Sequence, residues 1–257
     1  MIKIVFFKLE FFQNAGTFKS RGAINNILNL TDNQKQLGIT AVSAGNHAIA
    51  SSYVAKKFKL KNKIFMYNSA NEFRIKMCKK LNANLHFTDP YNAFKQVEIA
   101  SKEDGYFFIH PFDGPFTLQG TASLGLEICN QTNEIDNILI SVGGGGLISG
   151  IGSAIKQIYP KCNIIGVEPE GAKGLSESIS MKSPIKKVKV DTIADSLAAP
   201  LHMPYSFNIA NEVIDEMITV NDNQMVEAMR FMFQNFKMML EPACVAGIAA
   251  LMGPLNN

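Results

Sequence analysis

Short apolar runs alternate with longer segments of helical period along most of the chain. Runs rich in Ile, Val and Phe are typical of buried strands, and apolar residues at helical spacing are typical of amphipathic helices. This alternation favours an α/β protein with mainly parallel sheets. We predict a strand, a polar loop and a helix within residues 39–58. Further strands are predicted over 3–9, 63–68, 84–89, 106–111, 137–142 and 163–168, and further helices over 18–30, 71–83, 90–104, 120–132, 147–160, 221–239 and 242–252. The segment 173–205 is loop-rich and is expected to wrap over a site.

Composition narrows the class of partner. The net charge is only +3 and the basic residues are scattered, which argues against nucleic acid and against an anionic membrane surface. The four cysteines form no C-x-x-C pair, so we expect no zinc site, no disulfide framework and a cytoplasmic protein with reduced thiols. Residues 138–155 carry no charge, but four glycines among them favour a strand, a loop and a helix over a membrane span.

The stretch SVGGGGLISG, residues 141–150, places four consecutive glycines between a predicted strand and a predicted helix. Glycines let backbone N–H groups approach an anion closely, and a helix N-terminus favours negative charge. Phosphate is the natural ligand, and a tight turn is the simpler alternative. A dinucleotide fold is a further alternative, because Glu168 ends the next predicted strand where a ribose-binding acid belongs. Ser149 argues against it, since it occupies the place of the third glycine.

A second candidate loop is SAGNHA, residues 43–48, between a predicted strand and a predicted helix. Small residues and the Asn46 amide at a helix N-terminus suit a carboxylate or a phenolic oxygen. The plainer interpretation is a helix N-cap made by Ser43 or Asn46. His47 by itself is more often structural than catalytic.

The third candidate is Lys19, in GTFKSRGA, where it follows Phe18 and precedes Arg21. Most lysines are surface residues, so Lys19 alone indicates little. A phosphate site, a carboxylate site and an isolated lysine together indicate pyridoxal 5′-phosphate (PLP). The aldehyde of this cofactor forms a Schiff base with a lysine, and its phosphate binds a glycine loop. We therefore predict that PLP is attached to Lys19.

Seven stretches, taken in order, resemble one family. They are KLEFFQNAGTFKSRGA, SAGNHA, HPFDGPFTLQGTASLGLEI, SVGGGGLISGI, VEPEGA, TIADSLAAP and LEPACVAGIAAL. The chain resembles the fold type II PLP enzymes, most closely their serine/threonine dehydratase (threonine ammonia-lyase) branch. The resemblance covers essentially the whole chain.

The resemblance implies roles for individual residues. Lys19 is expected to hold PLP, with Phe18 packed beside the ring, and Asn46 is expected to bind the ring hydroxyl oxygen. Ser43, Asn46 and His47 present the loop that grips the substrate carboxylate. Glu241 matches a residue near the pyridine ring. The expected phosphate ligands are the backbone amides of Gly143, Gly144, Gly145, Gly146 and Leu147.

Two departures from the family pattern bear on activity. Members that racemise serine carry a serine at the position of Ala44, which serves as an acid and base on the second face of the ring. Ala44 cannot exchange a proton, so elimination is favoured over racemisation. A divalent-metal site of some members begins at the residue matching Glu168 and uses an acid near Gly174. Gly174 has no side chain, and we expect no metal.

The activity implied is β-elimination of water from L-threonine or L-serine, which gives 2-oxobutanoate or pyruvate and ammonia, with Lys19 as the base that removes the Cα proton. Alternatives are elimination from another 3-hydroxy amino acid, β-replacement or γ-elimination, racemisation, and an inactive, PLP-free fragment. The absorption of PLP bound to Lys19 discriminates the last of these from an enzyme.

For the architecture we expect two α/β lobes with the smaller inserted in the larger, as in the β subunit of tryptophan synthase. Residues 38–114 form the small lobe, residues 1–37 and 115–257 form the large lobe, and PLP lies between them. The resemblance implies a homodimer that acts on a small amino acid. The first predicted strand begins close to Met1 and the chain stops just after a helix, so we expect a partial chain in which the usual partner of the pyridine nitrogen lies beyond Asn257.

Overall fold

The computed structural model describes residues 4–255. The chain divides into two compact units, of which the first ends at Pro111 and the second begins at Phe112. This division lies close to the expected boundary between residues 114 and 115. The grouping of residues 1–37 with residues 115–257 stays a prediction.

The first unit is a parallel sheet with helices on both faces. Its four strands lie in the order β3-β2-β1-β4, and all the paired strands run parallel. The elements are the 3-10 turns η1 (Glu10–Phe12) and η2 (Asn14–Gly16), the helices α1 (Lys19–Leu28), α2 (Asp32–Leu37), α3 (Asn46–Lys57), α4 (Glu72–Lys80) and α5 (Pro90–Lys102), and the strands β1 (Ile39–Val42), β2 (Asn62–Tyr67), β3 (Leu85–Thr88) and β4 (Phe107–Phe108).

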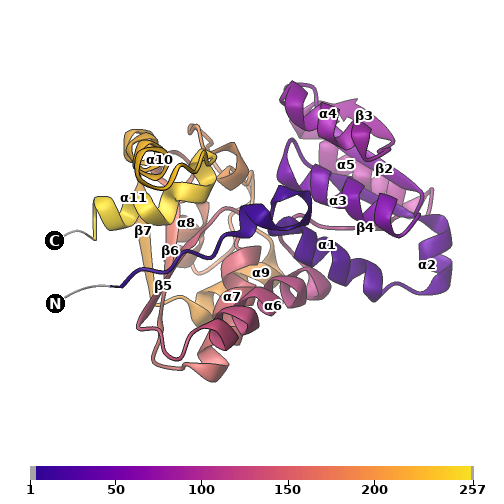
Figure 1. Cartoon of the computed structure of the whole chain (residues 1–257). Helices are drawn as coiled ribbons and strands as arrows, with labels where there is room; N and C mark the ends of the chain where they lie inside the picture. Colours follow the sequence, from indigo (N-terminus) through magenta and orange to yellow (C-terminus); the bar gives the residue numbers. More distant parts are fainter. Residues whose placement is uncertain (1–3, 256–257) are drawn as a thin grey trace. The chain divides into compact units, whose positions relative to one another are not determined.

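Alternate residues of the central strands face opposite sides of this sheet. Ala41 of β1 and Ile64 of β2 pack against α3 and α4, whereas Val42 and Phe65 pack against α5. Successive side chains of a strand point to opposite faces, and here both faces are covered by helices. The strands are therefore apolar at consecutive positions. Helix α3 therefore covers one face of the sheet and α5 the other (Figure 1).

The second unit contains a smaller parallel sheet of three strands in the order β5-β6-β7. Its strands are β5 (Asn137–Ser141), β6 (Asn163–Pro169) and β7 (Glu216–Val220), and its helices are α6 (Pro115–Gln131), α7 (Gly146–Ile158), α8 (Gly174–Ser180), α9 (Pro204–Val213), α10 (Asp222–Phe236) and α11 (Ala246–Met252). The 3-10 turns are η3 (Glu170–Ala172), η4 (Asp195–Leu197) and η5 (Pro242–Val245).

Helices α7 and α11 cover opposite faces of this sheet. A Cβ built on Gly166 of β6 would meet Ile148 of α7, and Gly166 is paired with Ile140 of β5. The neighbouring Leu139 points the other way and lies beside Gly247 of α11. The loop between β5 and α7 thus emerges at the carboxyl end of a strand whose two faces contact α7 and α11, where α/β proteins usually bind ligands.

The structure corrects one predicted strand. Residues 4–9 form no strand, and residue 3 of that prediction lies outside the described residues. Ile4 and Phe6 are 76% and 73% exposed, and no sheet partner among residues 4–255 pairs with this segment. An apolar run without a neighbouring strand cannot satisfy its backbone hydrogen bonds in a sheet.

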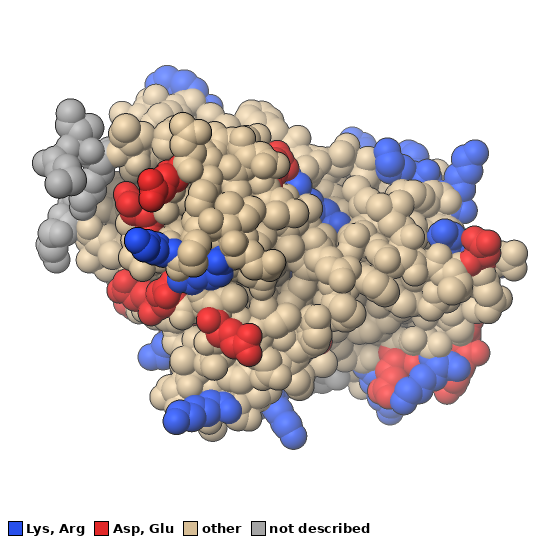
Figure 2. All heavy atoms as spheres, turned by 90° about the horizontal axis from the view of Figure 1, so that it is seen from below, with Lys and Arg blue, Asp and Glu red and all other residues tan. Residues whose placement is uncertain are grey.

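The described residues fit a protein with dispersed charge. On the face drawn in Figure 2, the Lys and Arg side chains are interspersed with Asp and Glu over a largely uncharged surface. Within residues 4–255, no helix combines the length and the apolar character that crossing a membrane requires. All four cysteines are free thiols.

Candidate active site

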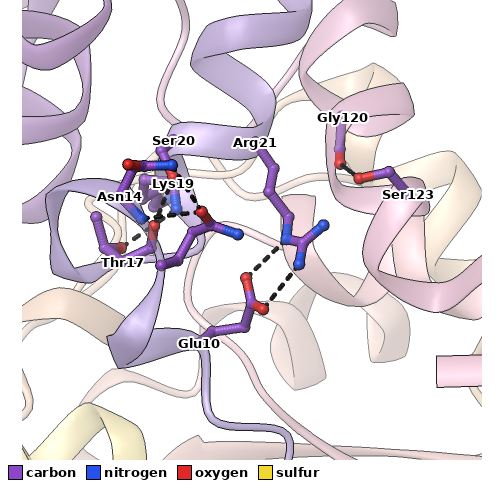
Figure 3. Close-up of polar contacts among 9 residues, drawn as sticks. Glu10, Asn14, Thr17, Lys19, Ser20, Arg21, Gly120 and Ser123 are labelled. Carbon is purple, nitrogen blue, oxygen red and sulfur yellow. Dashed lines mark hydrogen bonds and ion pairs between the residues drawn. The ribbon is translucent and has the colours of Figure 1, made fainter. Parts of the chain in front are cut away.

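Lys19 opens helix α1, and separate contacts hold its backbone N–H (Figure 3) and its side-chain amine. The Thr17 hydroxyl accepts the Lys19 N–H at 3.2 Å, and the Ser20 hydroxyl donates to the Thr17 carbonyl at 2.9 Å. The amine Nζ donates to the Pro111 carbonyl at 2.5 Å and lies 5.1 Å from the centroid of the Phe18 ring. The amine of Lys19 is therefore held against the Pro111 carbonyl in a half-buried position.

A buried ion pair anchors the same helix. Both nitrogens of the Arg21 fork bind the two carboxylate oxygens of Glu10, at 2.7 and 2.9 Å (Figure 3). The two side chains are only 13% and 17% exposed. Two parallel bonds fix direction as well as distance. Arg21 thus ties the first turn of α1, with Lys19 in it, to the turn η1.

The SAGNHA loop connects β1 to α3. The Ser43 hydroxyl accepts the Gly45 N–H at 3.0 Å, and Gly45 itself occupies the N-cap position of α3. Among the described residues no side chain caps this helix, so neither Ser43 nor Asn46 serves as the N-cap. A helix start without a side-chain cap keeps its first N–H groups available to an anion.

One short segment after β4 holds both the lysine and the loop. The Ile109 carbonyl accepts the His47 Nε2–H at 2.9 Å, and the Pro111 carbonyl accepts Lys19 Nζ. His110 lies between these two residues in sequence, and the charges of His47 and Lys19 help to lower its pKa. The segment 109–111 therefore brings Lys19 and the SAGNHA loop to the same place in the first unit.

Burial sets the charge states in this cluster. It lowers the pKa of Lys19 from 10.5 to about 8. Burial, reinforced by the Lys19 charge, lowers the pKa of His47 to about 3, and burial together with the charges of His47 and Lys19 lowers the pKa of His110 to about 3. Both imidazoles are neutral at physiological pH, and Lys19 is the group able to exchange a proton near pH 8.

In the second unit the four glycines form a loop that disfavours a side chain at each position, at Gly145 because of its backbone conformation and at the others because of close neighbours. A Cβ on Gly144 would overlap the Phe112 ring, one on Gly146 would overlap the Phe112 carbonyl, and one on Gly143 would lie 3.0 Å from the backbone of Leu197. Gly145 has φ of +89°, which glycine adopts without strain. Each of the four positions requires glycine.

The carbonyl groups of this loop accept hydrogen bonds from hydroxyls of the helices α6 and α7, whereas its N–H groups have no such partner among residues 4–255. The hydroxyls of Ser149 and Thr121 donate to the carbonyls of Gly145 and Gly146, at 2.9 and 2.8 Å. Within residues 4–255 no atom accepts a hydrogen bond from the N–H groups of residues 143–147. Uncompensated donors at the start of the apolar helix α7 make a site for an anion.

Comparison with known proteins shows the family of the chain. The family model described as "Pyridoxal-phosphate dependent enzyme" matches residues 2–256. The chain belongs to this family. Within it, the chain is similar to a phenylserine dehydratase of Ralstonia pickettii, at 40% identity over 97% of this chain and 77% of that protein. It is also similar to the "L-threonine dehydratase catabolic TdcB" of Staphylococcus aureus, at 35% identity over 98% of this chain and 74% of that protein.

A solved structure shows the same fold. Maize serine racemase superposes with a TM-score of 0.91 at 31% identity, over 96% of this chain and 75% of that one. The predicted α/β fold of the fold type II PLP enzymes is confirmed, as is PLP as the cofactor. This PLP enzyme is of the dehydratase and ammonia-lyase kind.

The residues present fit PLP. The glycine loop offers N–H donors that no side chain of its own covers, which suits a phosphate monoester. The enclosed amine of Lys19, whose pKa is lowered to about 8, is a lysine suited to bond with an aldehyde. Phe18, Lys19 and the SAGNHA loop lie in the first unit, and the glycine loop and Glu241, the N-cap of η5, lie in the second.

The Glu168 region does not fit a metal. The Glu168 carboxylate accepts the N–H groups of Leu175 and Ser176 at 2.7 and 3.0 Å and the Ser176 hydroxyl at 2.6 Å. A Cβ on Gly174 would lie 2.6 Å from Nε2 of His202, so a ligand side chain has no room there. Within residues 4–255 no cluster of three His, Cys, Asp or Glu residues could hold a metal ion.

Sequence reasoning did not single out two contributors to the site. His110 and Pro111 belong to the stretch HPFDGP directly after β4, and their roles depend on carbonyls and charges that meet residues far away in sequence. A signal was present, since polar residues that follow a parallel strand lie at the edge of the sheet where ligands bind.

The lowered pKa of Lys19 predicts how attachment of PLP depends on pH. Only the neutral amine attacks an aldehyde, so the attachment rate should rise as pH approaches 8 and level off above it. The measurement is a stopped-flow absorbance series on the chain freed of PLP. A rate that keeps rising toward pH 10.5 would show that the amine is solvated and contradict the geometry described above.

Proposed function

We propose that this enzyme removes water and ammonia from L-threonine and L-serine, yielding 2-oxobutanoate and pyruvate. The observation that carries the proposal is the enclosed amine of Lys19, which is partly neutral near pH 8 and lies beside the SAGNHA loop. A neutral amine held in place is a base for the Cα proton, and such catalysis is worth about 10²–10⁴ in rate. Similarity to an L-threonine dehydratase over nearly the whole chain supports the substrate class.

In this proposal Lys19 would hold PLP through its aldehyde carbon and, as a free amine, would take the Cα proton of the substrate. Phe18 would pack beside the ring, Asn46 would bind its hydroxyl oxygen and Glu241 would lie near the pyridine. The N–H groups of residues 143–147 would bind the phosphate. Ser43, Asn46 and His47 present the loop for the substrate carboxylate. When bound, PLP supplies delocalisation of the electron pair left at Cα.

A second candidate substrate is a 3-hydroxy amino acid with an aromatic β-substituent. It is favoured by the 40% identity to a phenylserine dehydratase, and the chemistry at Cα and Cβ is the same. Homodimeric assembly and a cytoplasmic location also belong to the proposal, and four free cysteines support the latter.

The test is a substrate panel. The PLP-loaded enzyme is incubated separately with L-threonine, L-serine and 3-phenylserine, and 2-oxo acid and ammonia are quantified. Equal amounts of 2-oxobutanoate and ammonia from threonine are expected. Turnover confined to 3-phenylserine would select the second candidate, and no 2-oxo acid from any of the three would overturn elimination of water.

Ala44 yields a prediction about reaction type. It lies half-buried at the end of β1 and provides no proton-exchanging group. Ala44→Ser should make D-serine appear from L-serine while elimination continues, as measured by chiral chromatography. Ala44→Gly, which changes the same position without adding a hydroxyl, is the control and should give no D-serine. Equal D-serine formation by the unmodified enzyme would contradict the role given to Ala44.

A further inference from the structure

We infer that Phe112 is a positioning residue for the PLP phosphate, because its ring and backbone form the floor on which the glycine loop rests. The inference rests on the proposed assignment of that loop to the phosphate. Phe112 is 6% exposed and begins the second unit, so all the contacts used here lie within that unit.

Two loop residues lie directly on Phe112. A Cβ added to Gly144 would overlap Cγ and both Cδ atoms of the ring. A Cβ added to Gly146 would overlap the Phe112 carbonyl oxygen and lie 2.8 Å from the Phe112 Cα. The loop therefore follows the surface of Phe112 at two of its four glycines, and glycine is required there because of Phe112.

The segment that carries Phe112 is itself held. The neighbouring Asp113 accepts the Ser206 N–H at 2.7 Å in the first turn of α9. The Ser206 hydroxyl lies 3.4 Å from the Gly144 carbonyl, and the Ser149 hydroxyl, which has one proton, lies 2.8 Å from the Ser206 carbonyl and 2.9 Å from that of Gly145. Hydrogen bonds thus link the segment of Phe112, the glycine loop and helix α9. A displacement of Phe112 is therefore expected to displace the loop as well.

Phe112 is proposed to fix the position of the glycine loop, and its side chain forms no hydrogen bond to a phosphate. Its ring has no donor for a phosphate, and the carbonyls of Gly145 and Gly146 are bound by Ser149 and Thr121 whether or not the ring is present. Gly144→Ala likewise keeps the N–H of residue 144 and adds only a methyl group. Any loss of affinity in either variant therefore reports a displaced loop.

The experiment is a double-mutant cycle on PLP affinity. Dissociation constants of PLP and of pyridoxal, which lacks the phosphate, are measured for the unmodified chain, Gly144→Ala, Phe112→Ala and the double variant. Gly144→Ala should weaken PLP binding about tenfold or more while changing pyridoxal binding little. In the Phe112→Ala background the added methyl group has room, so the double variant should bind PLP no more weakly than Phe112→Ala alone.

Controls separate this inference from the proposed function. Gly247→Ala adds a methyl group at ordinary contact distance, 3.5 Å from the Leu139 Cβ, and should leave PLP affinity unchanged. Where Phe112→Ala does not fold, Gly144→Ala measured alone still tests the inference, because unchanged PLP affinity in that variant would overturn it. Additive losses from the two substitutions would overturn the inference even if PLP binds normally. Failure of the unmodified chain to bind PLP would overturn the proposed function instead.

Discussion

Lys19→Ala is expected to abolish formation of 2-oxo acid from every substrate of this enzyme. The substitution removes both the amine proposed to bond to PLP and the base proposed to take the Cα proton, and the two imidazoles beside it are much weaker bases. His47 and His110, the neighbouring titratable side chains, have pKa values of about 3 and are hydrogen-bonded or buried. The expected loss is at least about 10²–10⁴ in kcat from the missing base alone.

The matched control for this loss is Lys76→Ala. Lys76 lies in the same unit, is 71% exposed and forms only a surface ion pair with Glu72, so its removal should leave kcat unchanged. Thermal unfolding of both variants separates loss of catalysis from loss of fold. Turnover by a folded Lys19→Ala variant at the level of its control would contradict the assignment of Lys19.

Gly146→Ala is expected to remove most of the bound PLP. The added methyl group would overlap the carbonyl oxygen of Phe112 and lie within 3.0 Å of its Cα and carbonyl carbon. These are backbone atoms, which cannot rotate away as the tip of a side chain can. The start of α7 must therefore shift, and with it the N–H groups proposed to bind the phosphate. A loss of about a hundredfold in PLP affinity corresponds to the upper part of the usual cost of overpacking.

The measurement is equilibrium titration with PLP, with the resulting activity followed at saturating PLP. Gly247→Ala is again the matched glycine control, because helix α11 leaves it room for a methyl group. Activity restored by excess PLP would locate the defect in affinity. Unchanged affinity in Gly146→Ala would exclude this loop as the phosphate site.

Helices and strands that bury one or two full faces were predictable from sequence. Strand β2 and helix α5 follow the predicted ranges closely, because their apolar periods match the faces that α3, α4 and the sheet cover. Helices α2, α8 and α9 and strand β7 were not predicted, and α8 lies in the segment 173–205 that was expected to be loop-rich. Helix α2 has only six residues, yet Thr31 and Gln34 form a capping box that signals its start. Pro204 at the beginning of α9 is a comparable signal.

The strand predicted at residues 3–9 was wrong, and it shows why an apolar run alone does not predict a strand. Apolar composition gives a segment the capacity to form a strand, but pairing depends on a neighbour that the local sequence does not contain. With Ile4 and Phe6 at 76% and 73% exposure, this segment has no such neighbour among the described residues.

The parts of the site formed by consecutive residues were predictable from the sequence. Four glycines after a strand indicate an anion loop, and the structure shows donors there without acceptors. The floor under the loop was not predictable, because Phe112 lies about thirty residues from Gly144 and has no polar atom in its ring to attract notice. The lowered pKa of Lys19 was likewise not predictable, since it follows from burial that only the folded chain provides.

The most direct test of the central claim is to locate the lysine that carries PLP. The purified PLP-loaded chain is reduced with borohydride, digested, and mapped by mass spectrometry for the phosphopyridoxyl group. The account predicts a single modified residue, Lys19, at near-complete occupancy. Modification at another lysine, or reduced protein without the group, would contradict it.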